Sequence, residues 1–191
     1  MTDERRAIRQ RLRALRRAVP AGERRAAAAA IDRALASIGL PRANGRISAF
    51  HPFDGEVDPS SVLRRARLLG CEVYYPVITS LRARRMRFVA PTAGSGGNTI
   101  NPRWLDLVLV PLVGFDARGH RLGMGAGFYD RHFAFLRHRT AWRKPLLAGL
   151  AFDVQRVDRL AEAAHDVPLW GVVTERGIYG KAAAQKAETG R

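Results

Sequence analysis

The chain has 191 residues, 47% of them hydrophobic, which suits one domain with a sizeable core. Its 33 Lys and Arg residues against 17 Asp and Glu give a formal net charge of +16, which attracts phosphates and other anions. Cys71 is the only cysteine, which excludes an internal disulfide and a cysteine-ligated zinc site. The sequence has no apolar run long enough to span a membrane, and its basic N-terminus lacks the apolar core of a signal peptide. We therefore expect a cytoplasmic protein with no membrane partner.

Two helices are predicted before the first strand. Along residues 4–18 the apolar side chains recur at spacings of four, three and four, which places them in one stripe on a helix. The members of that stripe are Ile8, Leu12, Leu15 and Val19. Arginines fill the other faces of this helix, and Pro20 ends it. A second helix is expected over 22–38, through an alanine run, and closes near Gly39.

The rest of the chain alternates between predicted strands and predicted helices. The expected strands are 46–50, 72–78, 85–90, 105–115, 146–152 and 171–174. The expected helices are 58–70, 127–138 and a short piece near 154–164, and residues 91–102 form a loop by composition. This alternation predicts an α/β fold with a mostly parallel central sheet and helices on both faces, a three-layer open α/β sandwich. We expect one domain over 1–180, followed by a flexible tail at 181–191.

The segment 114–133, GFDARGHRLGMGAGFYDRHF, combines glycines, basic residues and a carboxylate in one turn. It follows the most apolar strand, and ligands of α/β sheets usually bind at the carboxyl ends of strands. Alternating glycines allow several backbone N–H groups to point at one spot, and the helix start beyond them adds partial positive charge. Arg121 can neutralise phosphate oxygens, whereas Asp130 needs a divalent cation between itself and a phosphate. The pattern therefore indicates a phosphate cradle with a metal ion.

The glycine spacing alone leaves a plain turn as the alternative. G-x-G-x-G is not the dinucleotide-binding fingerprint, and no Gly-Lys-Ser/Thr follows as it does in a Walker A loop. The flanking residues are more specific. VPLVGFDARGHRLGMGAGFYDRHF (110–133) resembles the signature of the 5-formyltetrahydrofolate cyclo-ligase family, whose members are also called 5,10-methenyltetrahydrofolate synthetases. Further segments of this family are resembled by the first helix, by FHPFDGEVDP (50–59), by LAGLAFDVQ and by HDVPLWGVVT. The resemblance therefore covers about residues 4–176.

The resemblance implies an ATP- and magnesium-dependent enzyme that closes 5-formyltetrahydrofolate to 5,10-methenyltetrahydrofolate by phosphorylating the formyl oxygen. It places ATP on the first helix and the glycine turn, at Arg5, Arg9, Arg121, Leu122, Gly123, Met124, Gly125, Ala126, Gly127, Phe128 and Tyr129. It places the folate on His51, Glu56, Met124, Gly125, Ala126, Gly127 and Phe128. It assigns magnesium to Asp130 and Asp166, and catalytic roles to Arg121 and Tyr129.

Two departures from the family pattern bear on the folate pocket. Residues 91–104 are shorter than usual and lack a Glu-Pro pair, and Phe128 stands where a tyrosine is common. One open alternative is an ATP-using enzyme of the same fold that acts on another formylated amine. The other is a basic nucleic-acid-binding protein, favoured by a pI of about 11.5 and the arginine-rich helix. Because the basic residues are spread along the chain without an RNP-type aromatic motif, we expect no specific nucleic-acid partner, and we expect a monomer.

Overall fold

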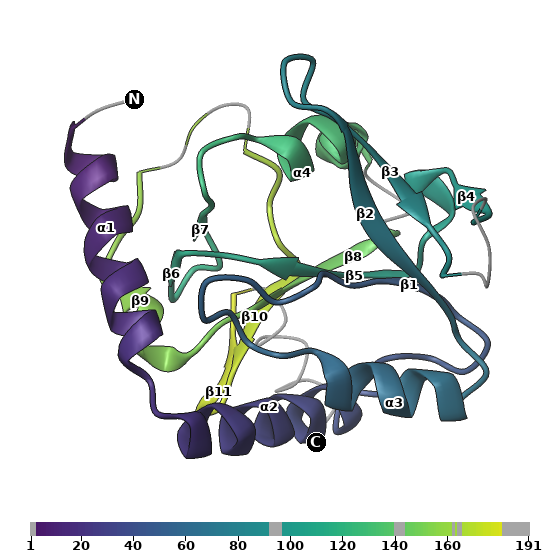
Figure 1. Ribbon diagram of the computed structural model, residues 1–191, viewed down its shortest axis with the longest axis horizontal. Helices are drawn as coiled ribbons and strands as arrows, with labels where there is room; N and C mark the ends of the chain where they lie inside the picture. Colours follow the sequence, from purple (N-terminus) through teal and green to yellow (C-terminus); the bar gives the residue numbers. More distant parts are fainter. Residues whose placement is uncertain (1–2, 92–96, 140–143, 162, 164–165, 181–191) are drawn as a thin grey trace.

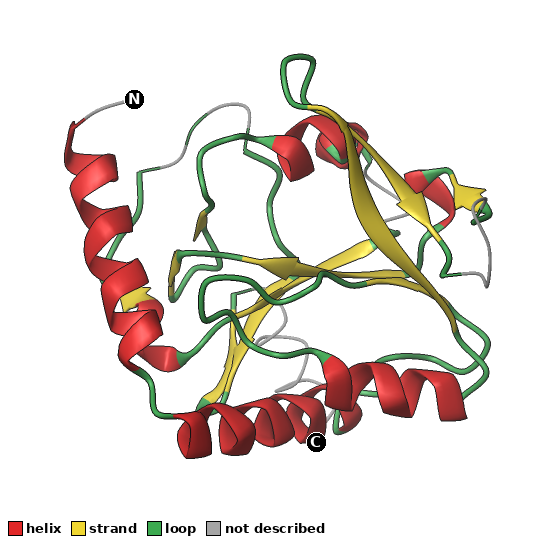
Figure 2. Cartoon of the chain, viewed as in Figure 1, coloured by secondary structure: helices red, strands yellow, loops and turns green. Residues whose placement is uncertain are grey.

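An eight-stranded sheet runs through the middle of the molecule, with helices on either side of it (Figures 1 and 2). Its strands are ordered β11-β10-β8-β5-β1-β2-β3-β4. The computed structural model describes residues 3–91, 97–139, 144–161, 163 and 166–180. The tail predicted at 181–191 lies outside the described residues.

The prediction of a mostly parallel α/β sheet is confirmed. The strands of this sheet are β1 (Arg46–Ser48), β2 (Glu72–Ser80), β3 (Arg85–Val89), β4 (Thr99–Ile100), β5 (Leu107–Pro111), β8 (Leu146–Leu150), β10 (Gly171–Thr174) and β11 (Gly177–Tyr179). Strands β2, β1, β5, β8 and β10 pair in parallel. Strands β3 and β4 at one edge and β11 at the other pair antiparallel.

Two hydrophobic clusters cover the two faces of this sheet. Helices α2 (Ala21–Ala36) and α3 (Ser60–Leu68) pack on one face, where Leu107 and Leu109 of β5 join their cluster. The alternate β5 residues Val108 and Val110 point to the other face, where they join Phe133 just beyond α4 (Phe128–His132). This alternation on a fully buried strand is the reason that β5 reads as continuously apolar.

Helix α1 (Asp3–Ala18) lies along one side of the molecule and contacts the 3-10 turn η3 (Asp153–Gln155) (Figure 1). Leu12 is buried and lies so close to Gly114 that a Cβ there would come 2.3 Å from a Leu12 methyl carbon. The predicted apolar stripe is partly wrong, because Leu15 is 44% exposed whereas Arg16 is only 1% exposed.

The long strand predicted over 105–115 is divided between two sheets. β5 ends at Pro111, and β6 (Gly114–Asp116) forms a second, three-stranded sheet with β7 (Arg121–Leu122) and β9 (Arg156–Val157). The Gln155 side-chain amide donates to the carbonyls of Leu112 and Val113, at 2.9 and 3.0 Å. These bonds satisfy backbone acceptors where the chain leaves the large sheet, which a hydrophobicity pattern cannot register.

Other local predictions also need correction. The helix expected over 127–138 is α4 followed by the 3-10 helix η2 (Ala134–His138). The helical piece expected near 154–164 is wrong, because η3 leads directly into β9; residues 162 and 164–165 lie outside the described part. The loop expected over 91–102 contains β4 and the start of η1 (Pro102–Trp104), and β11 was not predicted. Within the described ranges, no helix is long and apolar enough to cross a membrane.

Candidate functional site

The glycine turn, residues 123–127, joins β7 to α4 (Figure 1). Gly125 and Gly127 have φ angles of 100° and 67°, which side chains with a Cβ rarely adopt. Met124, Gly125 and Ala126 are exposed, so the backbone of the turn is open to a ligand. The following helix has only five residues, so its dipole adds less positive charge than a long helix would. Any anion bound here therefore depends mainly on backbone N–H groups and on arginines.

Two arginines of α1 reach this turn and the segment beside it. Arg9 Nε donates to the carbonyl oxygen of Gly123 at 2.8 Å. Arg5 Nη2 lies 4.0 Å from Asp166 Oδ2. Partial burial and the nearby charge of Arg5 lower the pKa of Arg9, although an arginine stays charged at neutral pH. The two predicted basic residues thus face the predicted phosphate site together.

Arg121 and Asp130 fasten the glycine turn to the segment around Val167. Arg121 Nη2 donates to Asp130 Oδ1 in a short ion pair, and Arg121 Nη1 donates to the Val167 carbonyl at 2.5 Å. The N–H of Val167 donates in turn to Asp130 Oδ1 at 3.0 Å. Asp166 is the next residue back, so the structure brings the two predicted metal-binding carboxylates to one corner.

This corner fits a magnesium ion better than a transition metal. No group of three or more His, Cys, Asp or Glu side chains that could hold a metal occurs within the described residues. Magnesium commonly binds through one or two carboxylates, with waters and substrate phosphates completing its shell. The side chains of Asp130 and Asp166 are 20% and 28% exposed, so neither carboxylate is closed off from a ligand.

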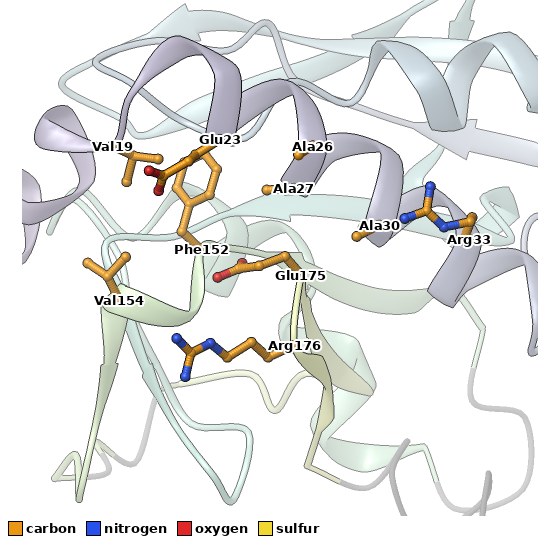
Figure 3. A pocket seen from close by; sticks show the side chains of 10 residues that line it. All are labelled: Val19, Glu23, Ala26, Ala27, Ala30, Arg33, Phe152, Val154, Glu175 and Arg176. Carbon is orange, nitrogen blue, oxygen red and sulfur yellow. The ribbon is translucent and has the colours of Figure 1, made fainter.

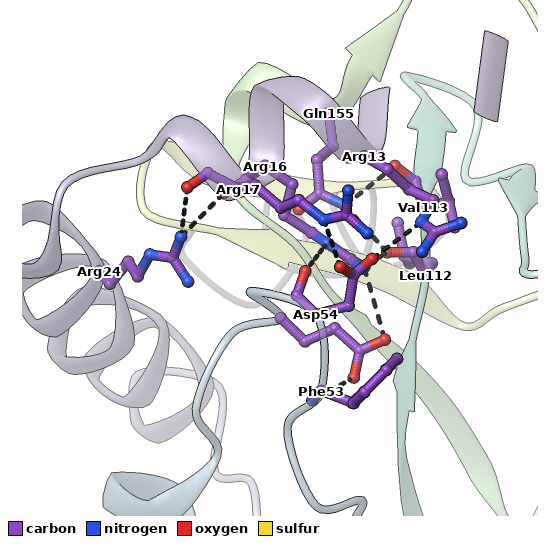
Figure 4. Close-up of polar contacts among 10 residues, drawn as sticks. Arg13, Arg16, Arg17, Arg24, Phe53, Asp54, Leu112, Val113 and Gln155 are labelled. Carbon is purple, nitrogen blue, oxygen red and sulfur yellow. Dashed lines mark hydrogen bonds and ion pairs between the residues drawn. The ribbon is translucent and has the colours of Figure 1, made fainter. Parts of the chain in front are cut away.

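The loop after β1 is attached to α1 by an arginine–carboxylate network (Figure 4). Arg16 Nη2 lies 2.9 Å from Asp54 Oδ2, and Arg16 Nη1 donates to Glu56 Oε1 at 3.4 Å and to the Leu112 carbonyl at 3.3 Å. Arg13 and Arg17 bind the same Asp54 carboxylate from α1. We call Arg16, Asp54 and Glu56 the Arg16 network. It fixes Glu56, one of the residues that the family resemblance assigns to the folate, relative to the end of β5.

The pKa values of Glu56 and Tyr129 are both raised. Burial, together with the charge of Asp54, raises the pKa of Glu56 despite hydrogen bonds from the Phe53 N–H and Arg16. Burial and the charge of Glu56 also raise the pKa of Tyr129, against the opposing charge of Arg121. Tyr129 is therefore a neutral hydroxyl at physiological pH, suited to donate a hydrogen bond but not to act as a base.

The remaining predicted residues differ in accessibility. His51 is exposed at the carboxyl end of β1 and stacks on Tyr75, with ring centroids 4.3 Å apart and planes 7° apart. Phe128 is partly buried against the cluster below α4. Leu122 is fully buried, so it can offer a ligand only its backbone.

A model of the 5-formyltetrahydrofolate cyclo-ligase family matches residues 1–175. The chain belongs to this family. It is 32% identical over 148 residues to 5-formyltetrahydrofolate cyclo-ligase of Escherichia coli K12, and this alignment covers 70% of this chain and 79% of that protein. It is 26% identical over 187 residues to the cyclo-ligase of Haemophilus influenzae, and this alignment covers 90% of this chain and 98% of that protein.

Two solved structures share the fold of this family member. The 5,10-methenyltetrahydrofolate synthetase from Mycoplasma pneumoniae superposes with a TM-score of 0.75 at 26% identity, over 91% of this chain and 99% of the other. The synthetase from Aquifex aeolicus gives a TM-score of 0.71 at 27% identity, over 92% of each chain.

The structure also adds residues that sequence reasoning missed. Arg16, Asp54 and Gln155 position the site, yet the sequence shows Arg16 only as one of many arginines on an amphipathic helix. Arg84, in the β2–β3 turn, reaches within 3.9 Å of where a Cβ on Gly127 would lie. In the sequence, nothing distinguishes Arg84 from the other arginines of this hairpin.

A cavity of about 420 Å³ lies elsewhere, between α2 and the ends of β8 and β10 (Figure 3). Ala27 and Phe152 contribute apolar surface, and Glu175 and Arg176 contribute charge. Glu175 accepts from the N–H of Asp153 at 3.1 Å, and Arg176 Nε lies 3.8 Å from Asp153 Oδ2. None of the predicted site residues lines this cavity. We therefore do not identify it as the candidate active site.

Proposed function

We propose that the chain catalyses the ATP-dependent conversion of 5-formyltetrahydrofolate to 5,10-methenyltetrahydrofolate, with release of ADP and phosphate. The formyl oxygen attacks the γ-phosphorus of ATP, and ADP leaves. The second folate nitrogen then attacks the formyl carbon, the carbon–oxygen bond breaks, and phosphate departs as that nitrogen loses its proton. Family membership supports this reaction, and the observation that carries the site is the convergence of Arg9, the glycine turn and Asp130.

The arginines and the turn supply the positioning and charge neutralisation that phosphoryl transfer needs. In this proposal Arg5 and Arg9 hold ATP phosphates from α1, while the N–H groups of residues 123–127 bind them from the turn. Arg121 and Asp130 compensate each other in the structure. A phosphate can replace Asp130 beside Arg121, and a cation can replace Arg121 beside Asp130, so that no buried charge is left unpaired.

Magnesium would be held by Asp130 and Asp166, where it neutralises the phosphate charge that develops during transfer. The folate would lie between His51, Glu56 and the glycine turn. The carboxylate of Glu56 can accept a pair of N–H groups from the pterin ring. Tyr129, kept neutral by its raised pKa, can donate a hydrogen bond to the oxygen that is phosphorylated. The turn also supplies Met124, whose exposed side chain can pack on the substrate.

A turnover assay that follows the absorbance of the methenyl product tests this proposal. With ATP, magnesium and 5-formyltetrahydrofolate we expect turnover that disappears when magnesium is chelated. Arg121→Ala should lower turnover about 100-fold or more, because one preorganised charge at a transition state has that typical effect. Asp130→Ala should raise the magnesium concentration that gives half-maximal rate.

Arg131→Ala is the matched control, since Arg131 is exposed on the same short helix. Its rate should stay within about twofold of the unmodified chain. Full activity of both Arg121→Ala and Asp130→Ala would reject the site. Thermal stabilisation by MgATP without turnover of the formyl-folate would instead favour another formylated amine as substrate. We further propose that the enzyme is monomeric and cytoplasmic, and that it lacks a specific nucleic-acid partner.

A further inference from the structure

A second charged pocket opens at the amino-terminal ends of the sheet strands, opposite the end where the glycine turn follows β5 and β7. Arg46 begins β1, Asp106 immediately precedes β5, and Lys144 lies two residues before β8. The register pairs Ile47 with Leu107 and Leu107 with Leu146, so these three strand starts are adjacent. The cavity between them measures about 380 Å³ and shares no residue with the candidate active site.

Among the described residues that line this pocket, positive charge exceeds negative charge. Its lining includes four cationic residues and one carboxylate: Arg46, Arg103, Arg139, Lys144 and Asp106. Although burial opposes ionisation, the hydrogen bond from Lys144 Nζ, at 2.6 Å, and the bond from the Arg46 N–H hold the pKa of Asp106 below its usual value. Asp106 therefore offsets about one of the four cations, and the pocket keeps a surplus that attracts an anion.

The arginines are held in place before any ligand arrives. The guanidinium groups of Arg103 and Arg139 both lie over the ring of Phe135, 4.5 and 4.8 Å from its centroid. Arg139 also donates to the carbonyl of Lys144. Asn101 caps η1 by accepting from the Arg103 N–H at 3.0 Å. Since less side-chain freedom remains to be lost, an anion that meets these groups binds at a lower entropic cost.

Trp104 adds an aromatic surface to the same pocket. It is 63% exposed, although its neighbour Leu105 is buried and anchors the turn that carries it. An exposed tryptophan beside a surplus of arginine charge is the combination that binds nucleotides, because bases stack on aromatic rings and arginines bind phosphates. A simple inorganic anion would use the arginines but would leave the indole uncovered.

We propose that this pocket, formed by Arg46, Arg103, Trp104, Arg139 and Lys144, is a second ligand site that binds a nucleotide unit independently of its base sequence. The base stacks on Trp104, and the phosphate lies against Arg103 and Arg139. The unit has two possible sources, a free mononucleotide or one residue of a single-stranded nucleic acid. The inference does not depend on the proposed cyclo-ligase activity, because the two sites occupy opposite ends of the strands.

Fluorescence anisotropy of a labelled octauridylate tests the proposal with the full chain. Trp104→Ala should weaken binding by roughly 5- to 150-fold, the usual effect of removing one stacking platform. Arg103→Ala should also weaken binding, and it should reduce the slope of log K against log salt concentration by about 0.7. Arg64→Ala removes one exposed charge from α3, far along the sequence from the pocket, and serves as the matched control. It should leave both affinity and slope unchanged.

The source of the nucleotide is separated by competition with AMP. Displacement of the octamer by AMP, lost in Trp104→Ala, identifies a mononucleotide site. Octamer binding that AMP does not displace, but that Trp104→Ala and Arg103→Ala weaken, identifies a site for a nucleic-acid chain. Equal affinity of the unmodified chain, Trp104→Ala, Arg103→Ala and Arg64→Ala for the octamer, with no AMP binding, overturns the proposal. Cyclo-ligase turnover of the unmodified chain, with ATP, magnesium and 5-formyltetrahydrofolate, reports separately on the proposed function.

Discussion

Replacing Arg16 by methionine keeps most of the volume of a fully buried side chain and removes its charge. The change deletes the contacts of Arg16 to the Asp54 carboxylate at 2.9 Å, the Asp54 carbonyl at 3.1 Å, Glu56 at 3.4 Å and the Leu112 carbonyl at 3.3 Å. Breaking a buried ion pair from one side costs about 3–5 kcal/mol, because the remaining charge is left without its partner. Asp54 keeps Arg13 at 2.8 Å, so we expect the lower end, about 3 kcal/mol.

The loss is measured as a melting temperature by circular dichroism. For a chain of this size each kcal/mol lowers the melting temperature by about 2–4 °C, so Arg16→Met should melt about 6–12 °C lower. Arg17→Met provides the control, because Arg17 binds the same carboxylate with a side chain that is 56% exposed. An exposed pair contributes about 1 kcal/mol or less, so this variant should lose under about 4 °C. Equal losses in the two variants would show that burial of Arg16 does not govern the stability of the network.

Three further changes test other parts of the structure. Arg9→Ala removes the donor to the Gly123 carbonyl and should raise the KM for ATP about tenfold while leaving the KM for folate within twofold, as steady-state kinetics would show. Gly114→Ala should destabilise the fold by roughly 1–3 kcal/mol in urea unfolding, because its Cβ meets Leu12 at 2.3 Å. Gly123→Ala, whose Cβ would meet nothing within 4 Å, should stay within about 0.5 kcal/mol, and equal losses would contradict the packing. Burial opposes ionisation of Asp54, but hydrogen bonds from arginines outweigh it and lower the pKa of Asp54 from 3.8 to about 2. The stabilising effect of this carboxylate is therefore present above pH 4 and is lost between pH 4 and 2. A midpoint of urea unfolding that stays flat over that window in the wild type, or that falls as steeply in Asp54→Asn, would contradict this expectation.

The sequence carried the order of strands and helices, because hydrophobic runs such as β5 and the turn residues around the glycines are local signals. It could not divide residues 105–115 into two sheets, since that break depends on Gln155, more than 40 residues away, binding the carbonyls of Leu112 and Val113. The short 3-10 and β pieces near residues 153–157 are likewise set by tertiary contacts rather than by propensity.

Part of the candidate site could also be predicted from the sequence, because part of it is encoded by a local pattern. The glycine turn and Asp130 stand close together in the sequence, so one local pattern names them. The sequence did not predict a role for Arg16, because an apolar stripe on a helix predicts that its leucines are buried. In the structure Arg16 is buried against two carboxylates and Leu15 is exposed. A buried arginine becomes recognisable only when its distant acidic partners are known.

Helix α1 is attached to the body of the protein by arginines as well as by the buried Leu12, and among the described residues neither core cluster includes a member of this helix. The exposed pair of Arg17 with Asp54 should therefore weaken as ionic strength rises, whereas the buried pair of Arg16 with the same carboxylate is screened much less. In the proposed function, changes at Arg5 and Arg9 of this helix would alter how firmly ATP is held without any change to the sheet.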